Sequence, residues 1–397
     1  MRFLRHLRSK IFEMIHYFNP GHEAAVLNAS KFYMPPKAVQ AMRRDLSYLP
    51  AWYAAPDDFV LVEGIAETQG IASLRDFQDF LQENFGKMAT AVTERELPHF
   101  IGQNVNLWGI SPQAIYFFEK HGFTMPAWNE KYRDLGSRFT AQKCLKFLTE
   151  NLPEIKQSTL PYFVKTLDEI EEILRNSTEK MLAKSPFSSS GRGLIWLPPT
   201  GNIARSERQI LSGILQKQPA VSIEKALNKI LDFSMHFEIK NADIQFVGYS
   251  VFQTNAKGAY EKSLLASQNF LEKEITKYIN LSLLEKVKFL LTFFLKQHYL
   301  PVYEGCIGID MLIYKENGKY FLHPCVEINM RKSMGYLAIM LHRNYIFEDS
   351  IGYFYCSKNI PAHEKQTPVF ENKRLKSGYL NLCPVNEHSR YCAYVEI

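Results

Sequence analysis

Alternating apolar and polar residues flank a turn signal, Asn317-Gly318, in the last third of the chain. Asn-Gly between two alternating runs is the strongest short-range signal for a β-hairpin. A two-residue turn at this point would pair Asp310 directly with Cys325. Because side chains alternate between the two faces of a strand, Glu327 and Asn329 would then lie on the same face as that pair.

This shared face is a candidate metal site. Diagonal neighbours on one face lie about 7–8 Å apart, which is close enough for two carboxylates to hold a pair of divalent cations. Asp, Glu and Asn offer oxygen ligands, which suit Mg²⁺. An ordinary hairpin with polar residues on its solvent-exposed face explains the spacing equally well, and a slip of one residue in register would move Asp310 to the opposite face.

A second pattern places small residues between two apolar runs. Lys184 ends the first run, Met181–Lys184, and residues 188–193 read Ser-Ser-Ser-Gly-Arg-Gly before the second run, Leu194–Leu197. Ser and Gly let backbone N–H groups approach phosphate oxygens, and the lysine supplies a positive charge. The segment is not a P-loop, because GxxxxGK[ST] is absent and a strand is expected after the loop. A flexible turn is the commoner explanation of such a loop alone, but its combination with the downstream hairpin favours a nucleotide site.

Together these patterns make residues 130–335 resemble the ATP-grasp superfamily, whose members are typically ADP-forming ligases that join a carboxylate to an amine or a thiol. The resemblance implies that Asp310, Glu327 and Asn329 are ligands of Mg²⁺, with two ions expected. It places Arg331 and Arg192 beside the transferred phosphoryl group. The residues that it assigns to ATP are Arg138, Lys184, Ser188, Ser189, Ser190, Gly191, Gly193, Glu224, Lys225, Leu227 and Asp232.

Some of these assignments have competing interpretations. Glu224 and Lys225 resemble the segment that receives the adenine, but they read equally well as the start of a solvated helix. Asp232 lies near the position where the family places a carboxylate on the ribose. Arg138 would replace the lysine that is usual at the start of a helix, and Lys143 is the competing cation.

Residues 14–125 alternate between strand-like and helix-like stretches, which predicts a small α/β domain with a parallel sheet. Ligands bind at the loops that follow the strands of such sheets. His22 and Glu23 follow the first predicted strand, so they are candidates for substrate contact, although a capped turn is the commoner explanation. The predicted strands are 15–18, 59–62 and 105–108, and the predicted helices are 37–46, 71–85 and 111–121.

The predicted fold class is therefore α/β, with a small N-terminal Rossmann-like domain (14–125) before a two-lobed ATP-grasp clamp. The first lobe is expected at 126–227. The second, 228–397, would hold the metal-binding hairpin and the C-terminal strands. Further expected elements are a strand at 246–252, one or two helices within 270–299, and a terminal hairpin formed by 378–382 and 391–395.

The bulk composition changes this picture little. The chain has 397 residues, of which 46% are hydrophobic and 22% charged, as in ordinary soluble globular proteins. Residues 1–13 contain four cationic side chains and one acidic one, and so supply +3 of the net charge of +6. The near balance of the remainder gives no support for a nucleic-acid partner. Residues 1–13 have three interpretations: a membrane-touching or targeting segment, a docking helix, or an extension upstream of a start at Met14.

The six cysteines show no paired spacing, which favours a reducing, cytoplasmic location over a disulfide framework. Their spacing also gives no support for zinc. The most apolar run, 289–295, is far shorter than the about 20 residues that a membrane span needs, and predicts a buried helix.

The predicted function is that of an ATP- and Mg-dependent ligase that activates a carboxylate as an acyl phosphate for attack by an amine. Both substrates would be small molecules or peptides, which the sequence does not identify, and a homodimer stays open. Two alternatives remain at this point: a small-molecule kinase on the same fold, and a non-catalytic nucleotide-binding module.

Overall fold

The N-terminal part of the chain forms a four-stranded parallel sheet. The computed structural model describes residues 13–64, 69–155, 160–187, 194–199, 202–256, 258–358, 361 and 366–397. This sheet has the order β3-β2-β1-β4, and its strand pairs are parallel as predicted. Its strands are β1 (Met14–Tyr17), β2 (Phe59–Val62), β3 (Thr90–Thr93) and β4 (Asn104–Leu107). The accompanying helices are α1 (His22–Asn28), α2 (Lys37–Asp45), η1 (Leu49–Trp52), α3 (Gln69–Phe85), η2 (Glu94–Phe100) and α4 (Pro112–Lys120).

The order of these strands reverses at β1, because the chain runs from β1 through β2 to β3 on one side and then returns to β4 on the other. The loops after β1 and β4 therefore leave the same edge of the sheet as neighbours. The Asn19 side chain joins them: its Nδ2 donates to the Gly109 carbonyl (2.7 Å), and its Oδ1 accepts from the Gly109 N–H (3.1 Å).

A small antiparallel sheet of order β5-β8-β6-β7 forms the next layer and contains the predicted strand–loop–strand unit. Ile170, Leu174 and Leu211 from its helices pack with its strands in one apolar core. The elements of this segment are α5 (Lys131–Leu135), α6 (Arg138–Asn151), β5 (Tyr162–Val164), α7 (Leu167–Arg175), β6 (Met181–Lys184), β7 (Leu194–Leu197), α8 (Arg205–Lys217) and β8 (Val221–Lys225).

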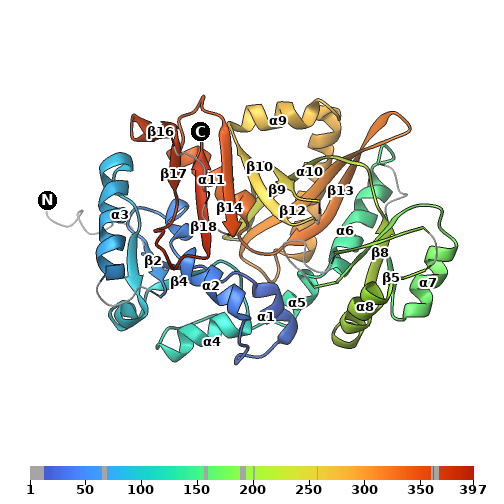
Figure 1. Cartoon of the computed structure of the whole chain (residues 1–397), viewed down its shortest axis with the longest axis horizontal. Helices are drawn as coiled ribbons and strands as arrows, with labels where there is room; N and C mark the ends of the chain where they lie inside the picture. Colours follow the sequence, from blue (N-terminus) through green and yellow to red (C-terminus); the bar gives the residue numbers. More distant parts are fainter. Residues whose placement is uncertain are drawn as a thin grey trace, which may run out of the picture.

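A large sheet of order β13-β12-β9-β10-β11-β14-β18-β17 occupies the centre of the molecule (Figure 1). In it, the predicted terminal hairpin is present as β17 and β18. The elements from β9 onward are β9 (Lys229–Lys240), β10 (Asp243–Thr254), β11 (Tyr260–Leu265), α9 (Gln268–Thr276), α10 (Leu281–His298), β12 (Gly305–Glu316), β13 (Lys319–Asn329), α11 (Met334–Tyr345), β14 (Gly352–Lys358), β15 (Val369–Glu371), β16 (Arg374–Ser377), β17 (Tyr379–Asn381) and β18 (Tyr391–Glu396).

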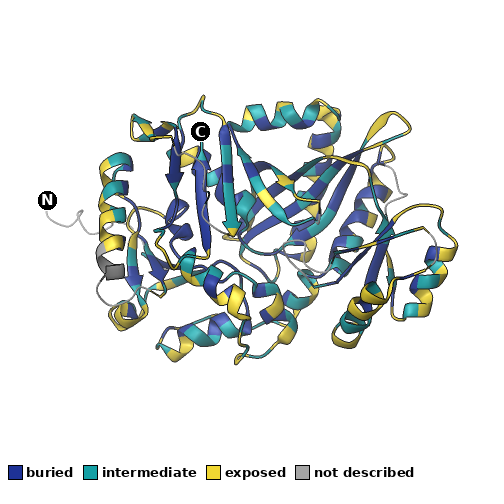
Figure 2. Ribbon diagram, viewed as in Figure 1, coloured by how far each residue is buried: buried dark blue, intermediate teal, exposed yellow. Residues whose placement is uncertain are grey.

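The two faces of this sheet differ in polarity. Phe233, Met235 and Phe237 of β9 pack with α6 and α10 in one apolar core. The alternate residues Ser234 and His236 are also buried, but lie on the opposite, polar face of the strand. Figure 2 shows the central strands as mostly buried, while α7 and α8 expose one side. The α/β fold class is thus confirmed; the positions of the domain boundaries stay predictions.

The predicted helix over 289–295 lies within α10, but the prediction that it is buried is only half right. Leu291, Phe294 and Leu295 are buried, whereas Phe289 is 72% exposed and Phe293 45% exposed. The apolar run continues around the helix, so part of it faces outward. No helix in the described ranges has the length and apolar character to span a membrane. All six cysteines are free, as expected.

The N-terminal sheet is joined to the large sheet through a buried cation, Lys332, in the segment between β13 and α11. Its ammonium donates to the Asn106 side chain and to the Leu107 carbonyl (3.1 Å), and its backbone N–H donates to the Trp108 carbonyl (2.9 Å). Burial lowers the pKa of Lys332. A single residue therefore satisfies three acceptors at the end of β4.

We expect Lys332→Met to lower the free energy of unfolding by about 2–3 kcal/mol, because the buried Leu107 carbonyl and the half-buried Asn106 side chain lose a charged donor. Chemical denaturation monitored by circular dichroism measures this. Lys240→Met, at an exposed position at the end of β9, is the matched control and should stay within about 0.5 kcal/mol of the wild type. Equal stability of the two variants would contradict the role given to Lys332.

Candidate functional site

The predicted hairpin is present as β12 and β13, but its register differs from the prediction. Asp310 pairs with Glu327 and not with Cys325, and Asn329 pairs with Gly308. The register shifts between Asp310 and Leu312, where β13 carries the extra residues. Pro324 lies in that stretch; a proline has no N–H for the ladder and is accommodated at bulges of edge strands such as β13. The shift brings the two carboxylates directly opposite each other.

Cys325 is consequently not part of the polar face. It is buried in the apolar core behind the sheet. The metal-ligand candidates are therefore the two carboxylates and the Asn329 carboxamide, whose Nδ2 donates to Asp310 Oδ2 at 2.9 Å.

The two opposed carboxylates make the site electrostatically unbalanced. Enclosure by protein atoms and the neighbouring Glu327 raise the pKa of the Asp310 carboxyl well above its usual range, against the opposing effect of Arg331. Two like charges this close favour a bound cation, and their oxygen donors suit Mg²⁺. In the described part of the chain no three His, Cys, Asp or Glu residues gather around a common point, so an ion here would use two carboxylates and an amide.

Arg138 lies beside this pair. It begins α6 after the N-cap Ser137, whose side chain accepts from the Thr140 N–H. The Arg138 guanidinium contacts Glu327 Oε2 at 2.5 Å and donates to the carbonyls of Ser185 (3.1 Å) and Val326 (3.3 Å). The competing candidate, Lys143, is exposed and does not line the cavity described below. Arg138 is therefore the better-placed of the two cations.

Lys184 and Glu224 form an ion pair between β6 and β8. Lys184 is 5% exposed, which is unusual for a lysine and leaves its charge directed at this partner. Glu224 and Lys225 lie in a strand, so the interpretation of these residues as the start of a solvated helix is wrong. The loop assigned to the phosphates, with Ser188, Ser189, Ser190, Gly191, Arg192 and Gly193, lies outside the described residues.

The connection from β8 to β9 also borders the cavity. The Lys225 ammonium bonds to Glu316 Oε1 (2.8 Å) and to Glu179 Oε1 (2.6 Å). Burial raises the pKa of Asp232, although Lys229 opposes this as its ion-pair partner. Leu227 lies between these charged groups and lines the same cavity.

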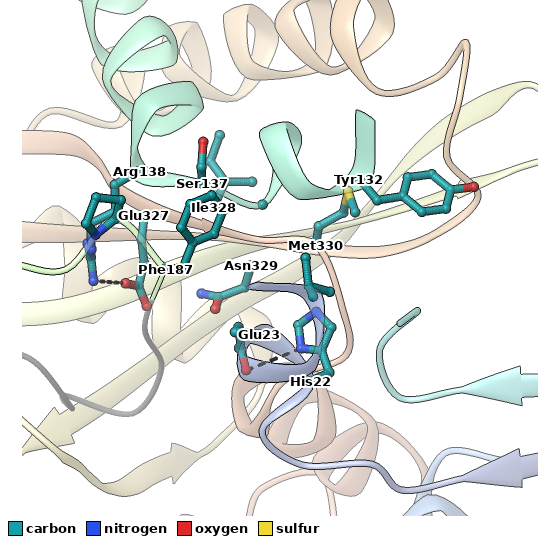
Figure 3. Close-up of a pocket in the computed structure, with 13 residues that line it drawn as sticks. His22, Glu23, Tyr132, Ser137, Arg138, Phe187, Glu327, Ile328, Asn329 and Met330 are labelled. Carbon is teal, nitrogen blue, oxygen red and sulfur yellow. Dashed lines mark hydrogen bonds and ion pairs between the residues drawn. The ribbon is translucent and has the colours of Figure 1, made fainter. Parts of the chain in front are cut away.

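His22 and Glu23 begin α1 and reach the site from the N-terminal sheet. Glu23 Oε1 is 2.5 Å from Arg331 Nε, and Glu23 Oε2 is 3.3 Å from His22 Nδ1. Burial raises the pKa of Glu23, but Arg331 and His22 outweigh it and hold that pKa well below its usual range. Figure 3 shows the His22–Glu23 and Arg138–Glu327 pairs lining one small cavity of about 30 Å³, with Asn329 drawn between them.

A larger cavity of about 330 Å³ connects all three layers of the structure. It brings together most of the predicted site residues that the structure describes. These are Glu23, Arg138, Lys184, Glu224, Lys225, Leu227, Asp232, Asp310, Glu327, Asn329 and Arg331. His22 lines only the smaller cavity beside it.

Sequence reasoning missed Ser234, which lines this cavity, and His236 behind it. His236 Nε2 is 2.8 Å from Ser234 Oγ, and burial lowers the pKa of His236 to about 3, so its ring is neutral near pH 7. The signal was present: in DFSMHFE, Asp232, Ser234 and His236 alternate with apolar residues, which is the pattern of a strand with one polar face.

No protein-family model and no curated protein sequence match this chain. Among solved structures, a biotin carboxylase–β,γ-ATP complex from Campylobacter jejuni is similar, with a TM-score of 0.52, 10% identity, and coverage of 97% of this chain and 87% of that chain. An N5-carboxyaminoimidazole synthetase from Staphylococcus aureus in complex with ADP has a TM-score of 0.45, 14% identity, and coverage of 88% and 82%. At these identities the similarity concerns the fold alone. The evidence for it is the biotin carboxylase match, whose TM-score is above 0.5.

We expect Asp310→Asn to stabilise the protein in chelator at neutral pH. The native-state pKa of Asp310 is raised, so its contribution to stability is present below about pH 4 and is lost as the pH rises through that raised value. An asparagine side chain does not ionise, so the variant does not lose this stability as the pH rises. Thermal melts between pH 4 and 8 in EDTA measure it, with the exposed Asp243→Asn as control. Added Mg²⁺ should raise the wild-type melting temperature and leave that of Asp310→Asn unchanged; equal responses to Mg²⁺ would contradict the site.

Proposed function

Because the chain has the ATP-grasp fold, we propose that it is an ATP-dependent ligase that forms an amide-type bond through an acyl phosphate. The main support is the opposition of Asp310 and Glu327 across β12 and β13, in a cavity that also contains the buried Lys184. Half-buried like charges in one cavity with a buried lysine are costly to maintain, which makes a purely structural role a poor explanation.

The nucleotide would occupy the part of the cavity between the two antiparallel sheets. Its base would lie near Leu227, Glu224 and Lys225 at the β8–β9 connection, and its ribose near Asp232. The Lys184 ammonium and the Arg138 guanidinium would neutralise phosphate charge. The loop from Ser188 to Gly193 would supply backbone N–H groups, with Arg192 as a further cation.

Asp310, Glu327 and Asn329 would hold Mg²⁺, with two ions expected, and the bound metal would neutralise and align the β- and γ-phosphates. Arg138 supports this set, because its bonds to Glu327 and to two carbonyls restrict the orientation of that carboxylate. Arg331 would stabilise the oxygens of the migrating phosphoryl group, and its ion pair with Glu23 holds the guanidinium in position.

In the first step a carboxylate oxygen of the substrate attacks the γ-phosphorus, the bond to the bridging oxygen breaks, and ADP leaves. In the second step an amine nitrogen attacks the carbonyl carbon of the acyl phosphate, and inorganic phosphate leaves as the amine loses a proton. His22 and Glu23 line the smaller cavity beside this site, where they would contact a small-molecule or peptide substrate.

The test is release of ADP and phosphate from Mg-ATP with pooled carboxylic acids, with and without amines. Hydroxylamine in a parallel reaction traps an acyl phosphate as a hydroxamate, which ferric chloride reveals. We expect hydroxamate and ADP in equal amounts with the wild type, and neither with Asp310→Asn. A stable phosphorylated alcohol in place of a hydroxamate would favour a kinase, and equal ADP release by both proteins would contradict the proposal.

For Lys184→Met we expect the Kd for Mg-ATP to rise about 10–100-fold, because a charge-assisted contact of about 1.5–3 kcal/mol is lost. Isothermal titration calorimetry measures the Kd. The double variant Lys184→Met/Glu224→Gln removes the ion-pair partner as well, and so separates lost phosphate contact from an unpaired Glu224 carboxylate. Lys240→Met is the control for the loss of one positive charge. A Kd within twofold of the wild type in both Lys184 variants would refute the contact.

A further inference from the structure

The large cavity has an apolar end beyond Arg331, away from the proposed nucleotide position. Its walls come from the loop after β1, from α2, from the residue after β4 and from the first turn of α11. The apolar residues that line this end, called the distal subsite below, are Phe18, Pro20, Val39, Met42, Trp108 and Met334.

The distal subsite lies where the N-terminal sheet is expected to bind ligands. The strand order β3-β2-β1-β4 reverses between β1 and β4, and Phe18 and Trp108 directly follow these two strands. In open parallel sheets the carboxyl ends of strands diverge at such a reversal and leave a crevice. The crevice here opens into the same cavity as the carboxylate pair.

The inner wall of the subsite is preorganised. Phe18 is 1% exposed and packs edge-to-face on Trp108, with ring centroids 4.9 Å apart, and Trp108 also contacts Tyr53. Gly21 has a left-handed φ of 74°, and a Cβ there would lie 3.1 Å from Val39 Cγ1. Glycine at this position therefore lets the loop close tightly over α2. Met42 and Met334 are half-buried and supply the adaptable part of the wall.

The charges at this end are already compensated. Of the described lining residues, Glu23 and Arg331 are the charged ones beside the distal subsite, and they pair with each other. A second charge on a substrate would lose water here without gaining a partner, which is unfavourable. An aliphatic or aromatic group would instead gain free energy in proportion to the apolar area that it removes from water.

Ser333, Met334 and Gly335 at the start of α11 line the cavity next to Arg331. This helix has 12 residues, and its first N–H groups and its dipole favour a negative group at this end. The polar side of the subsite thus suits a carboxylate, and the remainder suits an uncharged tail.

We propose that the distal subsite binds the side group of the carboxylate substrate, and that this substrate is a monocarboxylic acid with an apolar, aliphatic or aromatic tail. The carboxylate lies toward Arg331 and the γ-phosphate, and the tail lies against Phe18, Trp108 and Met42. This inference rests on the proposed ligase function for its catalytic readout, but tail binding can be measured without nucleotide.

The experiment uses a series of unbranched acids from acetate to octanoate, with adipate and 3-phenylpropanoate. Hydroxamate formation with Mg-ATP gives kcat/KM, and calorimetry on the nucleotide-free protein gives the Kd. We expect kcat/KM and affinity to rise about fourfold for each added methylene until the subsite is filled, which corresponds to about 0.8 kcal/mol per buried CH₂. Adipate should react at least tenfold more slowly than hexanoate.

A matched pair of variants tests the location. Met42→Ala should lower kcat/KM for octanoate about tenfold more than it lowers kcat/KM for acetate. Met125→Ala truncates another half-buried methionine of the N-terminal elements that does not line the cavity, and should leave both acids unchanged. Equal effects on acetate and octanoate in Met42→Ala would place the tail elsewhere.

The outcomes separate the two proposals. Chain-length-dependent binding without any hydroxamate would overturn the ligase function and support the subsite. Hydroxamate formation without chain-length dependence, or with a preference for adipate, would overturn the subsite and support the ligase. Absence of both binding and hydroxamate would overturn both.

Discussion

Two carboxylates that face each other across β12 and β13 determine the charge balance of the whole site. Asp310 and Glu327 repel each other in an enclosed space, so nearby cations are needed to keep the fold stable. Arg138 supplies one from the start of α6, and Arg331 supplies another from the end of β13. Arg331 is in turn balanced by Glu23 of α1. The charge of these two carboxylates is thus balanced by ion pairs that connect three segments distant in the sequence: α1, the start of α6, and the β12–β13 hairpin with the residues that follow it.

The segment after β13 also links the proposed catalytic site to the placement of the N-terminal sheet. Arg331 and Lys332 are consecutive, yet the first faces the carboxylates and Glu23 while the second is buried against Asn106 and Leu107. Because they share one short backbone segment, a shift of the N-terminal sheet would displace the proposed phosphoryl-contacting guanidinium. The proposed distal subsite lies at the same contact between the N-terminal sheet and the segment after β13. Binding of the substrate tail and phosphoryl transfer would therefore be coupled through this contact.

Much of this arrangement was predictable from local patterns, and the failures have identifiable causes. The Asn317-Gly318 turn and the parallel N-terminal sheet follow from turn chemistry and strand–helix alternation. The pairing of Asp310 with Cys325 was wrong because β13 carries extra residues around Pro324, which the turn sequence alone does not indicate. β3 was missed because Thr90–Thr93 offers too short an apolar run. The walls of the distal subsite come from four separate segments, and no local pattern reveals that they meet.

The contact between the first and last parts of the chain bears on how the protein reaches its native state. Trp52 Nε1 donates to the Leu382 carbonyl, and Asp45 Oδ2 accepts from the N–H groups of Arg390 and Tyr391. Leu380, Ala393 and Val395 lie in one hydrophobic core with Trp52, Val60 and Leu74. During synthesis these N-terminal elements therefore emerge with one apolar side uncovered, and Leu382, which pairs with Trp52, is added 330 residues after it. The apolar core on this side of the N-terminal sheet is therefore complete only after β17 and β18 have been synthesised.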